Sequence, residues 1–296
     1  MNHKPGAGEK LLLIHADDIG ICHAANQAAF GTMEFGLVKS GSIMMPCPWV
    51  NEVAAYFRRN PAADFGLHLT VNSEWQTLRW GPVASRDKVN SLLDREGCFW
   101  RSPADTRSHA KSNEIEIELT AQIEKALLLG FEPTHMDFHM GTLFLNPEWV
   151  EITWRLSDRY RIPLTMVRWS SAFSKREVES RGVPPEYMKP LLESYDARGI
   201  SNIDDFISVV NGVNLQERRE SYFQILRNLK PGISKLVIHP GLENDEMKHM
   251  MEGAADGLPK RAADYRVFTD TRTRELITSL DIRLVGWRDI LPTARQ

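Results

Sequence analysis

The chain has 296 residues, 42% of them hydrophobic and 25% charged, which is enough for a large core in one α/β barrel or in two smaller domains. The formal net charge of −3 argues against a surface that neutralises many phosphates, so no nucleic acid is expected as the main partner. The three cysteines show no C-x-x-C spacing, which predicts neither a disulfide framework nor a cysteine zinc site.

Membrane and export signals are not recognisable in the sequence. No run approaches the roughly 18 apolar residues that cross a bilayer, and residues 1–10 lack the apolar stretch of a secretion signal. We therefore expect a cytoplasmic protein without a membrane partner. A flexible tail over residues 1–10 and a single domain over residues 11–296 are predicted, and the oligomeric state is left open, with a homodimer as one option.

Short apolar runs alternate with helical patterns along the chain. The predicted strands are 11–16, 40–45, 64–71, 133–139, 162–169, 235–240 and 281–287. Amphipathic stretches lie between them, such as 113–130, where Asn113 and Glu116 have the spacing of a capping box and Gly130 marks the end of the helix. This alternation indicates a parallel sheet with covered faces, either doubly wound or closed into a barrel.

Two segments fit the alternation poorly, namely 72–111 and 171–213. We interpret both as elaborations over one end of the sheet, where the loops of α/β folds usually carry function. No linker and no internal repeat divides the chain, which favours one domain.

Acids and imidazoles stand at the ends of several predicted strands. The first strand ends in Asp17 and Asp18, the third contains His68, and the strand 235–240 contains His239. The fourth contains His135, Asp137 and His139. Because the carboxyl ends of parallel strands meet at one rim, these side chains are expected at a single edge of the sheet.

Each of these features has an ordinary explanation when taken alone. Adjacent acids after a strand often cap a helix, and a lone histidine such as His68 is more often a hydrogen-bonded core residue. The strand period of two, however, places His135, Asp137 and His139 on one face. Burying such a row unpaired costs roughly 1–3 kcal/mol for each group, so the combination points to a site.

Imidazoles together with one carboxylate form a divalent-metal site that keeps positions open for water and substrate. Consecutive side chains at a strand end point in different directions. One of the adjacent acids Asp17 and Asp18 would therefore bind the metal, and its neighbour would accept a proton from water.

Four motifs then carry a resemblance to a known family. HADDIG, FGLHLT, THMDFH and the late HPG resemble the NADDFG, GLHLT and THxDSH motifs and the histidine motif of the YdjC-like (ChbG-type) carbohydrate deacetylases. The resemblance extends from about Leu11 to Gly241. It implies a distorted (β/α) barrel with mostly parallel strands, related to the barrel of polysaccharide deacetylases.

The resemblance also implies roles for particular residues. Asp18, His68 and His139 would bind a divalent metal, Mg or Zn, with Asp17 as the general base and His239 as the general acid. The substrate would be a small carbohydrate, an N-acetylated sugar or oligosaccharide, from which the acetyl group is removed.

The chain departs from the family motifs at several positions. His15 stands in place of Asn, Ile19 in place of Phe and Phe138 in place of Ser, and the segment 140–142 replaces a histidine-rich continuation. These departures leave the proposed ligands in place and bear on the substrate more than on the chemistry.

Further residues are assigned supporting roles. Arg168 is expected to orient Asp17 through a charge-assisted pair, and Asp137, with His135 beside it, to fix the tautomer of a ligand imidazole. The tryptophans that could stack on sugar rings, with core packing as the alternative for each, are Trp80 and Trp169 first, then Trp75 and Trp100.

Other function classes remain open at this point. A metal hydrolase of another amide or an ester would use the same site, whereas a barrel-type sugar isomerase usually draws on several carboxylates. A non-catalytic sugar-binding protein would need neither Asp17 nor His239. A dinucleotide-binding enzyme is disfavoured, because no G-x-G-x-x-G follows the first strand.

Overall fold

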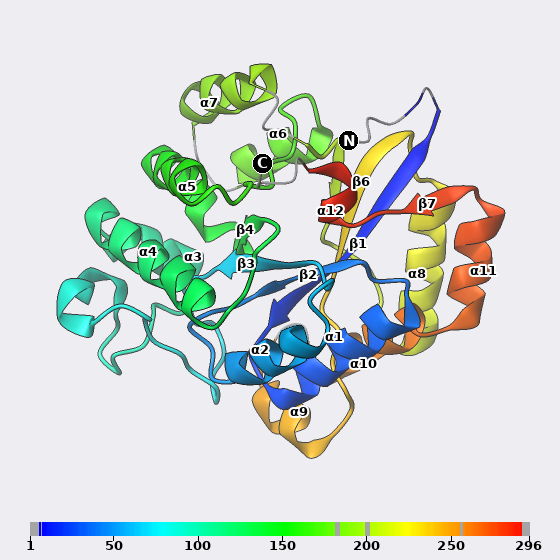
Figure 1. The fold of residues 1–296 in the computed structure, drawn as a ribbon, viewed down its shortest axis with the longest axis horizontal. Coiled ribbons are helices and arrows are strands. Elements are labelled where there is room, and N and C mark those ends of the chain that lie inside the picture. The colour runs from blue at the N-terminus through cyan, green and yellow to red at the C-terminus, as the bar shows by residue number, and fades with distance from the viewer. Residues whose placement is uncertain (1–5, 7, 181–183, 199–201, 255–256, 292–296) are drawn as a thin grey trace.

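The computed structural model describes residue 6 and residues 8–180, 184–198, 202–254 and 257–291. Its strands are β1 (Lys10–Ile19), β2 (Ser40–Ile43), β3 (Phe65–Leu69), β4 (Met136–Phe138), β5 (Asp205–Ile207), β6 (Gly232–Ile238) and β7 (Ile282–Leu284). The α-helices are α1 (His23–Phe35), α2 (Val50–Arg59), α3 (Pro103–His109), α4 (Ser112–Leu128), α5 (Pro147–Tyr160), α6 (Ala172–Ser180), α7 (Pro185–Ala197), α8 (Leu215–Arg227), α9 (Asp245–Met250), α10 (Gly257–Phe268), α11 (Thr271–Ser279) and α12 (Trp287–Ile290). Figure 1 shows these helices arranged around the sheet.

The sheet is parallel and is built around β1. Its order is β4-β3-β2-β1-β6-β5, and β7 pairs with β1 outside this path. One edge of β1 pairs with β6 along Lys10–Ala16. The other edge pairs first with β7, over Lys10–Leu12, and then with β2 from His15 onward. A strand with neighbours on both edges and covered faces must be apolar, and Leu11–Ile14 are fully buried.

The predicted strand 162–169 is wrong as a regular strand, because Pro163 has no N–H to donate to a ladder. The segment instead makes isolated bridges on its two sides. The Met136 N–H donates to the Pro163 carbonyl over 2.8 Å, and the Arg168 N–H donates to the Ile203 carbonyl over 2.9 Å. These contacts connect the β4 edge to the chain that enters β5, so the sheet curls into a distorted barrel. The predicted fold class is confirmed.

Other predicted elements differ in detail from the structure. The first strand is longer than predicted, since β1 begins at Lys10 and includes both acids; residues 1–5 and 7 of the predicted tail lie outside the described residues. The short β5 lies inside the segment 171–213, where no strand was predicted. The capping box is wrong, because α4 begins at Ser112 after Lys111, which makes no side-chain cap. The helix does end just before Gly130, which has a φ of 83°.

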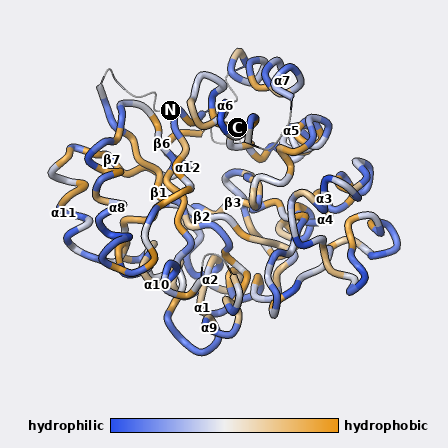
Figure 2. The backbone as a smooth tube through the Cα atoms, turned by 180° about the vertical axis from the view of Figure 1, so that it is seen from behind, coloured by the Kyte–Doolittle hydropathy of each residue, from blue (hydrophilic) through white to orange (hydrophobic). Residues whose placement is uncertain are grey.

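Hydrophobic residues follow the strands through the middle of the molecule. Figure 2 shows hydrophobic stretches along β1 and β6, whereas the surrounding helices alternate between hydrophilic and hydrophobic residues. This is the pattern of helices that bury one face against a sheet. Within the described ranges, no helix combines the length and the apolar character that crossing a membrane requires.

Helix α4 holds part of the segment 72–111 through buried acids. The Glu118 carboxylate accepts the backbone N–H groups of Val83 and Ala84 over 3.0 and 2.9 Å, and Glu114 accepts the N–H of Ser91 over 2.7 Å. Burial raises the pKa of Glu118 to about 7, although these backbone donors oppose the rise. The loop conformation therefore depends on acids of a neighbouring helix.

Replacing Glu118 with Ala should lower the free energy of unfolding by roughly 1–3 kcal/mol for each partly buried donor that is left unpaired. Chemical denaturation measures this loss. The matched control is Glu116→Ala on the same helix, where the exposed pair with Arg155 is expected to contribute less than about 1 kcal/mol. Equal effects at the two positions would contradict the anchoring role of Glu118.

Candidate metal centre

The end of β1 contains an irregularity that shapes the whole site. β1 and β2 pair at Ala16 and Gly41, and their register shifts before Ile19 and Ile43. Between them Asp18 has a φ of 62°, a conformation that Asp tolerates better than most residues. A side chain at Gly41 could not be accommodated, because its Cβ would lie 2.8 Å from the Ala16 carbonyl oxygen.

This bulge brings the adjacent carboxylates to one imidazole. In a regular strand Asp17 and Asp18 would point to opposite faces. Here Asp17 Oδ2 lies 3.8 Å and Asp18 Oδ1 3.7 Å from the same atom, His68 Nε2. Bulges beside active sites commonly redirect a side chain in this way.

The three side chains predicted as metal ligands lie together. Asp18 Oδ1 is 3.3 Å from His139 Nδ1, and ligand atoms of Asp18, His68 and His139 all lie within 4.8 Å of one another. Asp18 Oδ1 is buried and has no hydrogen-bond partner in the part of the chain that the structure describes. A buried carboxylate oxygen that faces two imidazole nitrogens without a hydrogen bond fits a cation between them.

Both imidazoles are held by a carboxylate on the nitrogen that faces away from Asp18. His68 Nδ1 donates to Asp137 over 2.7 Å, and His139 Nε2 donates to Glu74 over 3.0 Å. Each ring thereby presents its other nitrogen toward Asp18. Carboxylate–histidine pairs of this kind orient the ligands of protein metal sites.

The same carboxylates make protons compete for these nitrogens. Burial lowers the pKa of His139, but Glu74 and Asp18 outweigh it and raise the pKa to about 10. Burial also lowers the pKa of His68, and Asp17 and Asp137 raise it above its usual value. A cation that binds here must displace protons, so its affinity rises with pH.

The second oxygen of Asp18 faces the opposite side of the site. Arg261 Nη2 donates to Asp18 Oδ2 over 2.6 Å, and His239 Nε2 lies 3.9 Å from the same oxygen. Burial raises the pKa of Asp18, but His239 and Arg261 hold it well below its usual value. The His239 side chain is 28% exposed, and its backbone N–H donates to Asp264. The imidazole therefore lies at the edge of the site.

Asp17 lies near the buried ion pair of Lys235 and Asp137. Its Oδ1 accepts the Ser42 hydroxyl over 3.3 Å and lies 3.2 Å from His15 Nε2. In that ion pair, Lys235 Nζ lies 2.6 Å from Asp137 Oδ2. Burial raises the pKa of Asp17, but the charges of His68 and Lys235 outweigh it and hold the pKa below its usual value. Asp17 is therefore ionised at neutral pH.

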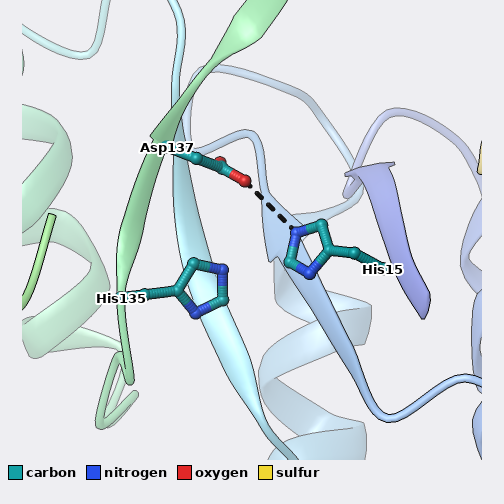
Figure 3. A group of neighbouring side chains, drawn as sticks. All are labelled: His15, His135 and Asp137. Carbon is teal, nitrogen blue, oxygen red and sulfur yellow. Dashed lines mark ion pairs between the residues drawn. The ribbon is translucent and has the colours of Figure 1, made fainter. Parts of the chain in front are cut away.

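A second cluster consists of His15, His135 and Asp137 (Figure 3). His15 Nδ1 and His135 Nε2 have no hydrogen-bond partner among the described residues. The Asp137 oxygen that faces His15, however, already binds the Lys235 ammonium. A second cation would be repelled there, so the Asp18 cluster is the better metal site. His135 contacts His15 and Thr134 and does not support a ligand imidazole directly.

The other predicted site residues lie apart from the ligands or have different surroundings. Arg168 forms its ion pair with Asp204 over 2.7 Å and not with Asp17, so it secures the segment between β4 and β5. Trp80 is only 3% exposed and its ring lies edge-on to His139 at 6.2 Å, which makes it a wall of the site. Trp169 is partly buried against the core, and its stacking on a sugar stays a prediction.

Three supporting residues were missed from the sequence, namely Glu74, Lys235 and Arg261. Lys235 had a signal, since it is a charged residue inside the apolar strand β6. Glu74 lies in an irregular segment and Arg261 on the distant helix α10, where no periodicity relates them to the site. Their roles arise only from the tertiary structure.

The chain is similar to known proteins over most of its length. The family described as YdjC-like protein matches residues 11–279. A carbohydrate deacetylase of Thermus thermophilus is 31% identical over 287 residues, which cover 96% of this chain and 94% of that protein. A chitooligosaccharide deacetylase of Yersinia enterocolitica is 33% identical over 135 residues, 44% of this chain and 49% of that protein.

A solved structure shares the fold. The crystal structure of a proposed cellobiose-phosphate cleavage protein of Enterococcus faecalis superposes with a TM-score of 0.76 at 22% identity, covering 95% of this chain and 98% of the other. The family match extends over most of the chain. The chain belongs to the YdjC-like protein family.

Proposed function

We propose that the protein is a metal-dependent carbohydrate deacetylase that hydrolyses the acetamido group of an N-acetylated sugar or oligosaccharide. The deacetylase names of its relatives in Thermus and Yersinia support the reaction class. The site supports hydrolysis because it combines a cation position, an ionised carboxylate and an imidazole at its edge.

One observation carries the proposal. The buried Asp18 Oδ1 forms no hydrogen bond with any described residue and faces His68 Nε2 and His139 Nδ1. Of the two cations that the family resemblance implies, Mg²⁺ and Zn²⁺, a set of two imidazoles and one carboxylate suits Zn²⁺ better. A divalent cation at this position supplies the Lewis-acid chemistry that activates water and polarises an acyl carbonyl.

Asp17 is the general base in this proposal. Its carboxylate is ionised and lies within 4 Å of the same His68 nitrogen as Asp18, so it adjoins the position where water would attack. Contacts with Ser42 and His15 hold its Oδ1, which leaves Oδ2 toward the site. The proton of the attacking water passes to this carboxylate.

His239 is the general acid. An amide nitrogen leaves poorly unless it is protonated, so hydrolysis needs a donor on the leaving-group side. The His239 imidazole is partly exposed just after β6 and lies on the Oδ2 side of Asp18. It can therefore donate a proton to the amide nitrogen of a substrate that binds from the solvent side.

The direct test is acetate release from N-acetylglucosamine and its β-1,4-linked oligomers. The metal-loaded protein should release acetate, removal of the metal by a chelator should abolish the release, and added Zn²⁺ or Mg²⁺ should restore it. Release that continues after chelation would contradict metal dependence. No release from the whole panel, with release from an O-acetyl sugar, would favour an esterase.

The same substitution at adjacent positions separates the roles of the acids. Asp18→Asn keeps an acceptor for Arg261 but removes the ligand charge, so bound metal should fall together with activity. Asp17→Asn should retain the metal and lower kcat by roughly 10²–10⁴. Elemental analysis and turnover measure the two effects. Metal loss in Asp17→Asn with retention in Asp18→Asn would exchange the assigned roles.

The acid role of His239 predicts a dependence on the leaving group. His239→Ala should strongly depress hydrolysis of the amide and spare an activated acetate ester, whose leaving group departs without a proton. The quantity measured is the ratio of amide to ester rates in variant and wild type. Equal losses on both substrates would leave His239 with only a structural role at the turn that follows β6.

A further inference from the structure

We propose that the acyl site accepts N-acyl groups longer than acetyl, with the acyl chain in an apolar cavity beside Asp17. This inference rests on the proposed function and extends it, because it names the part of the substrate that the site distinguishes. The hydrolysis itself is unchanged: water adds its oxygen to the acyl carbon, the C–N bond breaks, and the amine leaves with a proton.

The cavity adjoins the reacting groups. It has a volume of about 100 Å³, and its polar end is formed by Asp17, His68, Asp137 and Lys235. The rest of the wall is mainly apolar, with Phe138, Phe144, Phe173 and Phe206. An acyl carbon placed for attack by a water beside Asp17 therefore has its substituent next to these rings.

A second, smaller cavity adjoins the first. Its volume is about 30 Å³, and it shares the wall residues Phe144, Val167 and Phe173 with the first cavity. Its remaining wall is Met166, Ser174, Val178 and Leu192. The apolar surroundings thus continue away from Asp17, and few polar partners are available beyond the first cavity.

The chemistry of these walls selects the end of the substrate that fits. A sugar ring has hydroxyl groups that would lose hydrogen bonds with water and find few partners among the phenylalanines. An alkyl chain has no hydrogen bonds with water to lose on entry, and the burial of its apolar surface is favourable. The sugar therefore stays on the open side with His239, and the acyl group enters the cavity.

The volume exceeds what acetyl needs. One water-sized group takes roughly 10–15 Å³ of such a cavity, so about 100 Å³ has room for several groups, whereas acetyl brings a single methyl. Phe138 and Gly141, which line this cavity, lie where the sequence departs from the family motifs. The positions that differ from the family motifs therefore line the same cavity that has more space than an acetyl group needs.

The test is a series of glucosamines with N-acetyl, N-propanoyl and N-butanoyl groups, assayed for amine release by the metal-loaded protein. Each added methylene that leaves water should raise kcat/KM by about threefold, which gives about tenfold from acetyl to butanoyl. A kcat/KM for butanoyl at or below that for acetyl overturns the proposal.

A variant pair assigns the effect to the cavity. Val167→Phe fills space that both cavities share, so it should lower the butanoyl-to-acetyl ratio of kcat/KM at least fivefold relative to wild type. Val209→Phe, the same exchange at a side chain that is 83% exposed, should leave that ratio unchanged. An unchanged ratio in Val167→Phe would overturn the placement of the chain, and the wild-type series stands alone if this variant does not fold.

A binding measurement separates this inference from the proposed function. If no N-acyl sugar releases its amine, the proposed function fails. Calorimetric titration of the protein with acetate and butanoate still tests the cavity, because butanoate should bind about tenfold more tightly. Equal or weaker binding of butanoate would overturn the inference without any measurement of turnover.

Discussion

The bulge at the end of β1 is the constraint on which the rest of the site depends. A regular strand would separate Asp17 and Asp18 onto opposite faces of the sheet, and only one could then reach His68. The shift in register and the positive φ of Asp18 bring both carboxylates within 4 Å of the same nitrogen. Such backbone strain costs roughly 1–3 kcal/mol and is maintained by its surroundings, here the absence of a side chain at Gly41 and the Arg261 bond.

Around the bulge, buried charges are arranged in pairs, and Asp18 Oδ1 forms no hydrogen bond to a described residue although it lies 3.3 Å from His139 Nδ1. Arg261 binds one oxygen of Asp18, and carboxylates bind the far nitrogens of His68 and His139. Buried ions are stable only with such partners. What remains is a carboxylate oxygen and two imidazole nitrogens that face one another, so the hydrogen-bond network that stabilises the fold would also preorganise these groups for the proposed cation.

The strands and the meeting of acids and imidazoles at one rim were predictable because both depend on local patterns, whereas the choice of Asp18, His68 and His139 as metal ligands came from the family resemblance and stays a prediction. Apolar runs identify β1, β3 and β6, and polar residues at their carboxyl ends must meet at one rim. Arg168 could not be placed in this way, because its partner Asp204 comes from a connection that no local pattern defines. Glu74 and Arg261 reach the site from a loop and an outer helix, so only tertiary packing relates them to it. The strand at 162–169 failed for a local reason, since Pro163 interrupts the ladder.

The most direct test of this account is the position of a bound cation. Crystals soaked in Zn²⁺ and measured at the zinc absorption edge should show one anomalous peak about 2.0–2.2 Å from Asp18 Oδ1, His68 Nε2 and His139 Nδ1. That result would establish that the free carboxylate oxygen and the paired imidazoles form the metal centre. A peak within the cluster of His15, His135 and Asp137, with the Asp18 site empty at saturating Zn²⁺, would contradict it.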